Sequence, residues 1–398
     1  MGYDIDALVD RAHDRRSSDI HIVCGKPVRI RVDGELQDLD DKVLTSEDCE
    51  NIARSLAGDR YEKIKEIGEL DFAGTYAGIR CRLNVFRQQR HASAVIRLLS
   101  DDIPLLEDLG LPEVMSQFAT WPRGIVIITG ETGSGKSTTL ASLLDRINHT
   151  RRENIITLED PIEYVYTPDL CSINQREIGT DTDSYETGLK AILREDPDII
   201  LIGEMRSLDT IETALTAAET GHLVFATLHT NSAPDAIDRI VDVFPGEKQQ
   251  QIRLQLSMTL KAVVSQQLLR KKGGKGRVAA CEVMIVNSAI KNLIREGKSP
   301  QIVNVLTTSA SEGNITMDNM LIKMVREGKI DSGTALEAAN DQEAVRKGLG
   351  MGGSSPMGQG GFGFGGGSGR PQGGSSNQTP AGSPGIASRG FGFNKDGR

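Results

Sequence analysis

Residues 130–137 are Gly130-Glu131-Thr132-Gly133-Ser134-Gly135-Lys136-Ser137, and they match the pattern GxxxxGK[ST] in full. The apolar run Ile125-Val126-Ile127-Ile128 precedes this loop, and a helical pattern follows it from Thr138, so the strand-to-helix context of the motif is present. Glycines allow backbone N–H groups to turn inward around phosphate oxygens, and a helix N-terminus adds positive potential. We therefore predict that residues 130–138 bind the phosphates of ATP, with Lys136 on the β- and γ-phosphates and Ser137 on Mg²⁺.

Three more short apolar runs follow, each flanked by Gly, Pro or charged residues and separated by helical segments. They are Ile155-Ile156-Thr157-Leu158, Ile199-Ile200-Leu201-Ile202 and Leu223-Val224-Phe225-Ala226. Continuous apolar strands that alternate with helices are typical of a parallel, doubly wound α/β sheet covered on both faces. Further along, the spacing of apolar residues predicts helices over residues 249–267, 288–296 and 318–327. The P-loop domain is expected over residues 118–348.

The first 105 residues have a different pattern, which predicts a smaller α+β domain. Residues 28–32, 80–86 and 94–98 alternate as half-buried strands, and Asp33-Gly34 is typical of a hairpin turn. Helices are expected over residues 3–13 and 46–57, the second with Thr45 or Ser46 as its N-cap. We expect an antiparallel sheet in this domain and a linker over residues 106–117.

Glycine is concentrated at the other end of the chain. Of 43 glycines in 398 residues, 18 lie between Gly350 and Arg398, where Ile386 is the single Leu, Ile or Val. Such a segment buries too little apolar surface to offset its ordering entropy, so we expect residues 349–398 to be a disordered tail. The tail has four basic residues and one acidic residue; since the whole chain carries −9, the first 349 residues carry −12.

This composition excludes several classes of protein. An acidic body disfavours nucleic acid as a partner. No apolar run approaches the ~18 residues of a transmembrane helix, and Met1-Gly2-Tyr3-Asp4-Ile5-Asp6 lacks the features of a secretory signal. The five cysteines are scattered without a CxxC pair, which argues against structural zinc and fits a reducing cytosol.

Acidic residues follow two of the predicted buried strands. Glu204 comes directly after Ile199–Gly203, and at the carboxyl end of a parallel strand it would face the nucleotide and act on Mg²⁺. Glu159, Asp160 and Glu163 follow the strand at residues 155–158. One carboxylate near the γ-phosphate could polarise the attacking water, and the spacing alone leaves open which one.

Histidines and arginines supply further candidates. His222 and His229 flank the strand 223–227, either as γ-phosphate sensors or as packing residues. An arginine-rich patch lies on the predicted strands of the first domain: Arg80, Arg82, Arg87, Arg90 and Arg97. It is either a solvated strand face or a source of arginine fingers for a neighbouring subunit's nucleotide.

Taken in order along the chain, these motifs resemble the secretion-superfamily ATPases, and most closely the type IV pilus retraction ATPases. The resemblance covers about residues 1–347 and rests on these segments: Ser18-Asp19-Ile20-His21, the arginine strands, the P-loop, the Asp box at 158–163, Ile202-Gly203-Glu204-Met205-Arg206, the His box at 220–230, Asn174-Gln175-Arg176-Glu177-Ile178-Gly179 and Ser288–Glu296. The last segment resembles the retraction motif AIRxLIRE, with Lys291 where the family usually has Arg.

The resemblance implies a RecA-like P-loop domain preceded by a PAS-like domain, and it assigns roles to residues. Glu163 would be the catalytic base, Glu204 the acid on Mg²⁺, and His222 and His229 would sense phosphate, with Arg82 and Arg97 the trans-acting arginines. It also implies a homo-hexameric, ATP-hydrolysing motor for pilus retraction in twitching motility. The ring would be cytoplasmic and peripheral at the inner face of the cell membrane. It would work on the inner-membrane platform protein, with a paralogous retraction ATPase as a further partner.

Two alternatives remain open at this point. An assembly or type II secretion ATPase is disfavoured because this chain starts at the Ser-Asp-Ile-His domain and has no tetracysteine motif. A non-hydrolysing, ATP-binding accessory subunit is disfavoured because Lys136, Glu163 and Glu204 are all present.

Overall fold

The structure is a computed structural model that describes residues 4–32, 34–99 and 102–351. The tail expected over residues 349–398 therefore lies outside the described residues from residue 352 onward. None of the described helices is long and apolar enough to cross a membrane.

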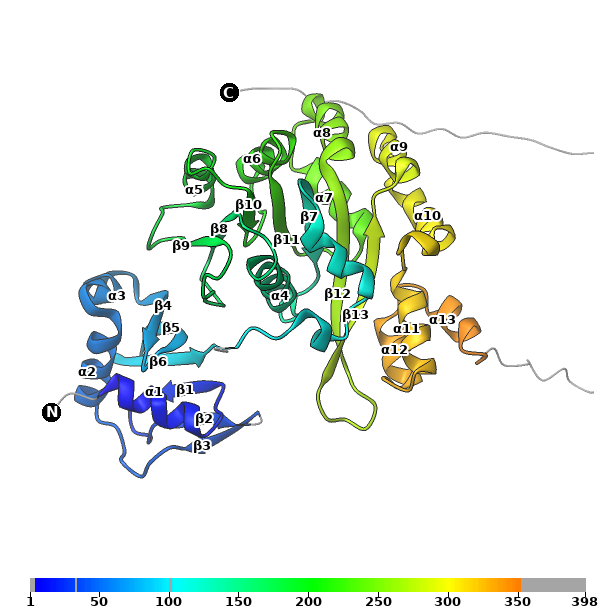
Figure 1. The fold of residues 1–398 in the computed structure, drawn as a ribbon. Coiled ribbons are helices and arrows are strands. Elements are labelled where there is room, and N and C mark those ends of the chain that lie inside the picture. Colours follow the sequence, from blue (N-terminus) through cyan, green and yellow to red (C-terminus); the bar gives the residue numbers. More distant parts are fainter. Residues whose placement is uncertain (1–3, 33, 100–101, 352–398) are drawn as a thin grey trace, which may run out of the picture. The chain divides into compact units, whose positions relative to one another are not determined.

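The N-terminal part contains a six-stranded sheet in the order β3-β2-β1-β6-β5-β4, in which every neighbouring pair is antiparallel (Figure 1). Its strands are β1 (Asp19–Ile22), β2 (Arg29–Val32), β3 (Glu35–Asp38), β4 (Glu69–Tyr76), β5 (Ile79–Gln88) and β6 (His91–Leu98). Its helices are α1 (Ile5–Asp14), α2 (Ser46–Ala57) and α3 (Tyr61–Ile67), with the short 3₁₀ turn η1 (Gly58–Arg60) between the last two. The apolar sides of these helices share one core with one face of the sheet, which confirms the α+β architecture.

The start of α2 shows how the sequence sets an element's boundary. The Thr45 side chain accepts from the backbone N–H of Asp48, and the Asp48 carboxylate accepts from the backbone N–H of Thr45. This capping box satisfies two N–H groups that a helix start leaves free. Because the charged form of Asp48 receives these hydrogen bonds, its pKa falls to about 2.

The second sheet has seven strands in the order β13-β12-β7-β11-β10-β8-β9. Its strands are β7 (Gly124–Thr129), β8 (Asn154–Glu159), β9 (Ser172–Glu177), β10 (Ile199–Ile202), β11 (Leu223–Leu228), β12 (Leu260–Arg270) and β13 (Arg277–Ile285). All neighbouring pairs are parallel except β12 and β13, which form an antiparallel hairpin. The four strands predicted from apolar runs are all present, and the sheet is mixed at one edge rather than wholly parallel.

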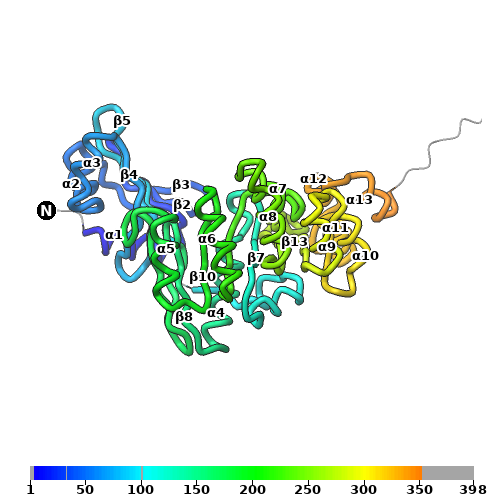
Figure 2. Tube along the Cα trace, turned by 90° about the horizontal axis from the view of Figure 1, so that it is seen from above, coloured from blue at the N-terminus to red at the C-terminus, as the bar shows by residue number. Residues whose placement is uncertain are grey.

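Both faces of this sheet are covered, as the apolar runs predict (Figure 1 and Figure 2). Along β7, Val126 and Ile128 belong to one core while Ile125 and Ile127 belong to the other. The first core includes α4 (Lys136–Asn148), η2 (Leu106–Leu109), η3 (Glu113–Thr120), α11 (Met317–Arg326), α12 (Ser332–Ala338) and α13 (Gln342–Gly348). The second includes α5 (Tyr185–Ile192), α6 (Leu208–Glu219), α7 (Ala233–Asp242), α8 (Gly246–Thr259), α9 (Ser288–Glu296) and α10 (Ile302–Thr308). Two 3₁₀ turns, η4 (Ser299–Gln301) and η5 (Ala310–Glu312), flank α10.

The expected helix over residues 249–267 is wrong in its second half. Helix α8 ends at Thr259, and the chain continues as β12, parallel to β7. Val263 and Val264 are β-branched and fully buried on opposite faces of the sheet, which strand geometry permits and one helix stripe does not.

The segment 106–117, expected as a linker, folds onto the second sheet. It forms η2 and enters η3, and both Leu106 and Met115 are buried in the same core as Val126. Apolar side chains such as those of Leu106 and Met115 can be buried against the sheet even when they lie in short 3₁₀ turns.

Candidate functional site

The P-loop connects β7 to α4 as predicted. Gly130, Gly133 and Gly135 all have positive φ angles, of 144°, 79° and 90°, which residues with a Cβ rarely adopt. A Cβ on Gly130 would stand 2.3 Å from the backbone oxygen of Gln266 and 2.7 Å from Ser134 Oγ. The loop is therefore shaped by its glycines, because a side chain at position 130 would displace the neighbouring strand.

Gln266 on β12 holds this loop in place. It is 2% exposed, its Oε1 accepts from Thr139 Oγ1 at 2.9 Å, and its Nε2 donates to the backbone oxygen of Ser134 at 2.8 Å. Ser134 Oγ is buried and has no hydrogen-bond partner, so the cradle contains a polar atom that is free to bind a ligand. Sequence reasoning missed Gln266 because it placed this residue on a helix.

Lys136 begins α4 and is 8% exposed. Its Nζ donates to the backbone oxygens of Gly130 at 2.7 Å and Glu131 at 2.9 Å. Burial lowers the pKa of the Lys136 ammonium, while the charges of Glu204 and Glu163 act in the opposite direction. The lysine and these two carboxylates therefore gather at the carboxyl edge of the sheet, although they come from three different loops.

Glu204 lies just beyond β10 and contacts the side chains of Arg206 and His229. Arg206 Nε lies 2.5 Å from Glu204 Oε1, and His229 Nε2 lies 3.3 Å from Oε2. Burial alone would raise the pKa of Glu204, but the contacts with Arg206 and His229 outweigh it and the pKa is lowered. Glu204 is thus kept as a carboxylate, the form that binds a divalent cation.

Two of the three acids after β8 occupy different environments. The carboxylate of Glu159 accepts from Thr157 Oγ1 at 2.7 Å and Gln175 Nε2 at 3.2 Å, yet desolvation raises its pKa to about 7. Glu163 is half-buried, and its charge adds to the rise in the pKa of Glu159. The structure therefore separates a carboxyl group that supports the loop from one whose charge acts on Lys136.

The two predicted histidines lie at opposite ends of β11. His229 follows the carboxyl end and contacts Glu204. His222 precedes the amino end, where its Nδ1 pairs with the backbone oxygen of Ala217 at 2.8 Å. Because β11 runs parallel to β7, the structure does not bring His222 to the P-loop of its own chain.

Arg82 and Arg97 are directly opposite each other on β5 and β6 of the N-terminal sheet. Both are exposed, and Arg97 Nε donates to Asp19 Oδ1 at 2.9 Å. Two like charges facing each other across strands are destabilising unless anions offset them, and Asp19 supplies one such charge.

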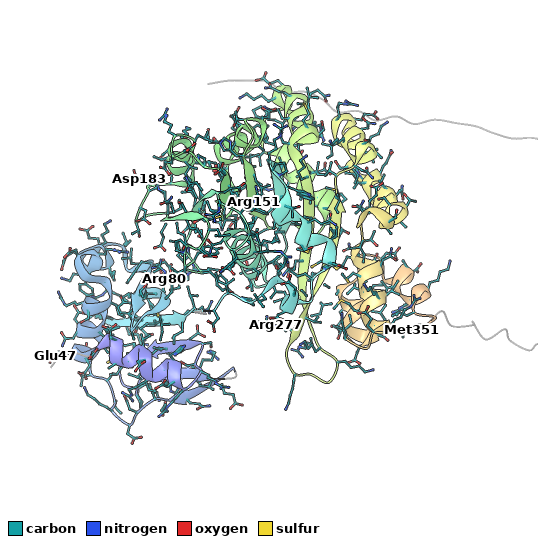
Figure 3. The ribbon with its side chains drawn as sticks, viewed as in Figure 1. Glu47, Arg80, Arg151, Asp183, Arg277 and Met351 are labelled. Carbon is teal, nitrogen blue, oxygen red and sulfur yellow. The ribbon has the colours of Figure 1, made fainter. Side chains whose placement is uncertain are left out.

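Two adjoining cavities open beside the P-loop. One, of about 700 Å³, is lined by residues that include Gly135, Thr138 and Leu268. The other, of about 550 Å³, is lined by Glu131–Ser134 and Asn231 among others. Gln266, Leu268 and Arg277 line both, so the β12–β13 hairpin forms their common wall; Arg277 is labelled in Figure 3. A polar cavity at the phosphate loop and a more apolar one at the start of α4 fit a nucleotide's phosphates and its base.

Comparisons with known proteins agree with this geometry. A model of the type II/IV secretion system protein family matches residues 2–337. The type IV pilus retraction ATPase PilT of Pseudomonas aeruginosa is 46% identical over 342 residues, which are 85% of this chain and 99% of that protein. A twitching motility protein of Neisseria gonorrhoeae is 45% identical over 318 residues, which are 79% of this chain and 85% of that protein.

Among solved structures, the crystal structure of the pilus retraction motor PilT with bound ADP superposes with a TM-score of 0.81 at 43% identity. The superposition covers 87% of this chain and 99% of the PilT chain in that crystal structure. The similarity in sequence and fold thus extends over nearly the full length of PilT. This chain belongs to the type II/IV secretion system protein family and, within it, to the pilus retraction ATPases.

Proposed function

We propose that this protein is an ATP-hydrolysing motor that drives the retraction of type IV pili. The observation that carries the proposal is that β7, β8 and β10 run parallel, so the loops after their carboxyl ends place Lys136, Glu163 and Glu204 at one edge of the sheet. Membership of the retraction ATPases supports the direction of movement, since the geometry of the site alone carries no direction.

Each side chain has a role that its surroundings support. Lys136 moves from the loop oxygens to the β- and γ-phosphates, because both sets of oxygens attract the same ammonium group. Glu163 acts as general base toward the attacking water. His229 contacts Glu204 and so couples the end of β11 to the state of the phosphate.

Ser137 and Glu204 would hold Mg²⁺, which supplies charge neutralisation on the phosphates when it is bound. A hydroxyl and a carboxylate are the oxygen ligands that Mg²⁺ prefers, and the remaining positions are taken by phosphates and water. Among the described residues there is no group of three or more His, Cys, Asp or Glu side chains placed for a metal. A magnesium ion bound mainly through the nucleotide requires none.

Arg82 and Arg97 fit a role toward a neighbouring subunit's nucleotide in a homo-hexamer. Their facing positions on β5 and β6 place two guanidinium groups together, and a polyphosphate would offset the repulsion between them. The proposed ring acts at the inner face of the cell membrane on the pilus platform protein, beside a paralogous retraction ATPase. Movement of the N-terminal domain against the P-loop domain would convert phosphate contacts into displacement.

The enzymatic part of the proposal is tested by ATP turnover of the purified protein with and without Mg²⁺. Lys136→Ala and Glu204→Ala should each abolish Mg²⁺-dependent turnover, on the order of a hundredfold or more. Wild-type turnover no greater than that of Lys136→Ala would refute hydrolysis and favour an accessory subunit.

The cellular part is tested by deleting the gene and imaging pili. Loss of retraction with retained or excess pili is expected. Cells without pili would instead indicate an assembly motor.

A further inference from the structure

Strand β9 is the edge strand of the second sheet, and two of its side chains cross over to the loop that carries Glu163. In the parallel register with β8, Gln175 is the partner of Thr157 and Glu177 is the partner of Glu159. Gln175 and Glu177 are two residues apart, so they lie on the same face of the strand. This strand contains the Asn-Gln-Arg-Glu segment, to which the ATPase chemistry assigns no role.

Gln175 uses both ends of its amide on the Asp-box loop. Its Oε1 accepts from the backbone N–H of Tyr166 at 3.0 Å. Its Nε2 donates to the backbone oxygen of Tyr164 at 2.7 Å and to Glu159 Oε1 at 3.2 Å. An amide side chain offers one acceptor group and two donor hydrogens, and all of these are engaged.

Glu177 holds the other side of the same loop. It is 4% exposed, and its Oε2 accepts from the backbone N–H of Ile162 at 3.1 Å. Arg80 of β5, labelled in Figure 3, forms an ion pair with the same oxygen and so compensates a buried charge.

Backbone groups on both sides of Glu163 are therefore fixed by side chains. Ile162 N–H donates to Glu177, and the Tyr164 oxygen accepts from Gln175. Hydrogen bonds to a charged carboxylate are stronger than neutral ones and restrict a loop more tightly.

We propose that Gln175 and Glu177 are positioning residues that hold the Glu163 loop in its reactive geometry. The inference rests on the proposed role of Glu163 as general base and goes beyond it, because both residues bind the loop and neither lines the two cavities beside the P-loop. A displacement of a catalytic group by about 1 Å can cost a hundredfold in rate while leaving substrate binding intact.

The experiment compares steady-state ATP turnover, the KM for ATP, the Kd for ADP and thermal unfolding in the full-length protein. The variants are Gln175→Ala, Glu177→Ala and Glu177→Gln. The matched control is Asn174→Ala, on the same strand but exposed and contacting Asn154 rather than the loop. We expect Gln175→Ala and Glu177→Ala to lower kcat by about tenfold to a hundredfold. KM and Kd should stay within about twofold of wild type, and Asn174→Ala should behave as wild type throughout.

The conservative variant separates positioning from general destabilisation. Glu177→Gln keeps a carbonyl oxygen for Ile162 N–H, so its kcat should lie clearly above that of Glu177→Ala. Equal turnover of the two variants would refute a role in holding this N–H group. If Gln175→Ala does not fold, this pair of variants decides the question.

Failure of this inference differs from failure of the proposed function. If Glu163→Gln abolishes turnover while Gln175→Ala and Glu177→Ala keep kcat within twofold of wild type, the base assignment stands and the positioning role is wrong. If Glu163→Gln turns over ATP normally, the base assignment itself is wrong and the positioning role falls with it. A rise in KM at unchanged kcat would also overturn the inference, since it would place both residues in nucleotide binding.

Discussion

Glu159 offers a stability test of the site that does not depend on its activity. Its carboxyl group is desolvated at the end of β8, so its pKa is raised from 4.5 to about 7, despite the hydrogen bonds from Thr157 and Gln175. Between these two values the folded protein retains a proton that the unfolded chain releases. Folding stability contributed by Glu159 is therefore present at low pH and is lost as the pH rises from about 4.5 to 7.

The size of this loss follows from the pKa shift. A tenfold change in proton affinity corresponds to about 1.4 kcal/mol, so the rise of the Glu159 pKa from 4.5 to about 7 amounts to roughly 3.5 kcal/mol in total. Between pH 5 and pH 8 the wild type should lose about 2.5 kcal/mol of unfolding free energy through this group. The variant Glu159→Gln cannot lose it, because an amide does not titrate there. In a domain of this size, the difference in Tm between wild type and variant should change by roughly 5–10 °C across that interval.

The fluorescence of Trp121 provides the assay. Trp121 is the single tryptophan of the chain, and its ring centroid lies 4.7 Å from that of Phe118, beside the core of the P-loop domain. Its fluorescence therefore reports on the unfolding of the domain that contains Glu159. Any cost of replacing an oxygen by NH₂ is independent of pH and cancels in the comparison. Glu247→Gln, at an exposed position in the first turn of α8, controls for removing one negative charge. If the difference in Tm between the wild type and Glu159→Gln stays constant from pH 5 to pH 8, the Glu159 carboxyl group is not desolvated as the structure indicates.

Three further outcomes follow from other contacts. Gly130→Ala should weaken ADP binding by about tenfold or more, measured by titration calorimetry, because φ is 144° and a Cβ would stand 2.3 Å from the Gln266 oxygen; unchanged affinity would contradict the loop geometry. Glu282→Ala should lower the unfolding free energy, measured in urea titrations, by about 2–4 kcal/mol. The reason is that the buried Glu282 side chain accepts hydrogen bonds from backbone N–H groups in the first turns of α7 and α11, at 2.8 and 3.3 Å. A loss below about 1 kcal/mol would argue that these two hydrogen bonds contribute little to stability. Arg97→Ala should reduce ATP turnover about a thousandfold. If Arg97 acts on the nucleotide of a neighbouring subunit, mixing the Arg97→Ala and Lys136→Ala proteins should restore part of the turnover. No recovery in mixed rings would show that Arg97 acts on the nucleotide of its own subunit.

Much of the fold could be predicted because several elements carry local signals of their own. Helices α2 and α9 have the predicted bounds, Ser46–Ala57 and Ser288–Glu296. The first has a capping box and the second has Gly297 in the left-handed conformation at its end. The four buried parallel strands were visible as apolar runs, since both of their faces lie against helices.

Other elements depend on partners that are distant in sequence. Strand β9, Ser172-Ile173-Asn174-Gln175-Arg176-Glu177, contains a single apolar residue, so neither an apolar run nor a regular alternation marks it. Its Gln175 and Glu177 form hydrogen bonds with a loop nine to fifteen residues earlier in the chain, and no local pattern reveals these contacts. The residues of β12 follow a helix without a break, and their apolar run is compatible with either structure until β7 is present as a neighbour.

The candidate site also combines residues that local sequence patterns predict with residues that depend on distant parts of the chain. Residues that would touch phosphate lie in motifs at the ends of buried strands, where sequence reasoning found them. The residues that hold those motifs lie on the two sides of the central strands: Gln266 on β12 holds the P-loop, and Gln175 on β9 holds the Asp-box loop. Both are glutamines whose amides bind loop backbone, which keeps the loops rigid without adding charge beside the phosphates. Variation at these positions would therefore alter turnover while the P-loop, the Asp box and the acid after β10 stay intact, so these three motifs alone are not sufficient evidence of an active motor.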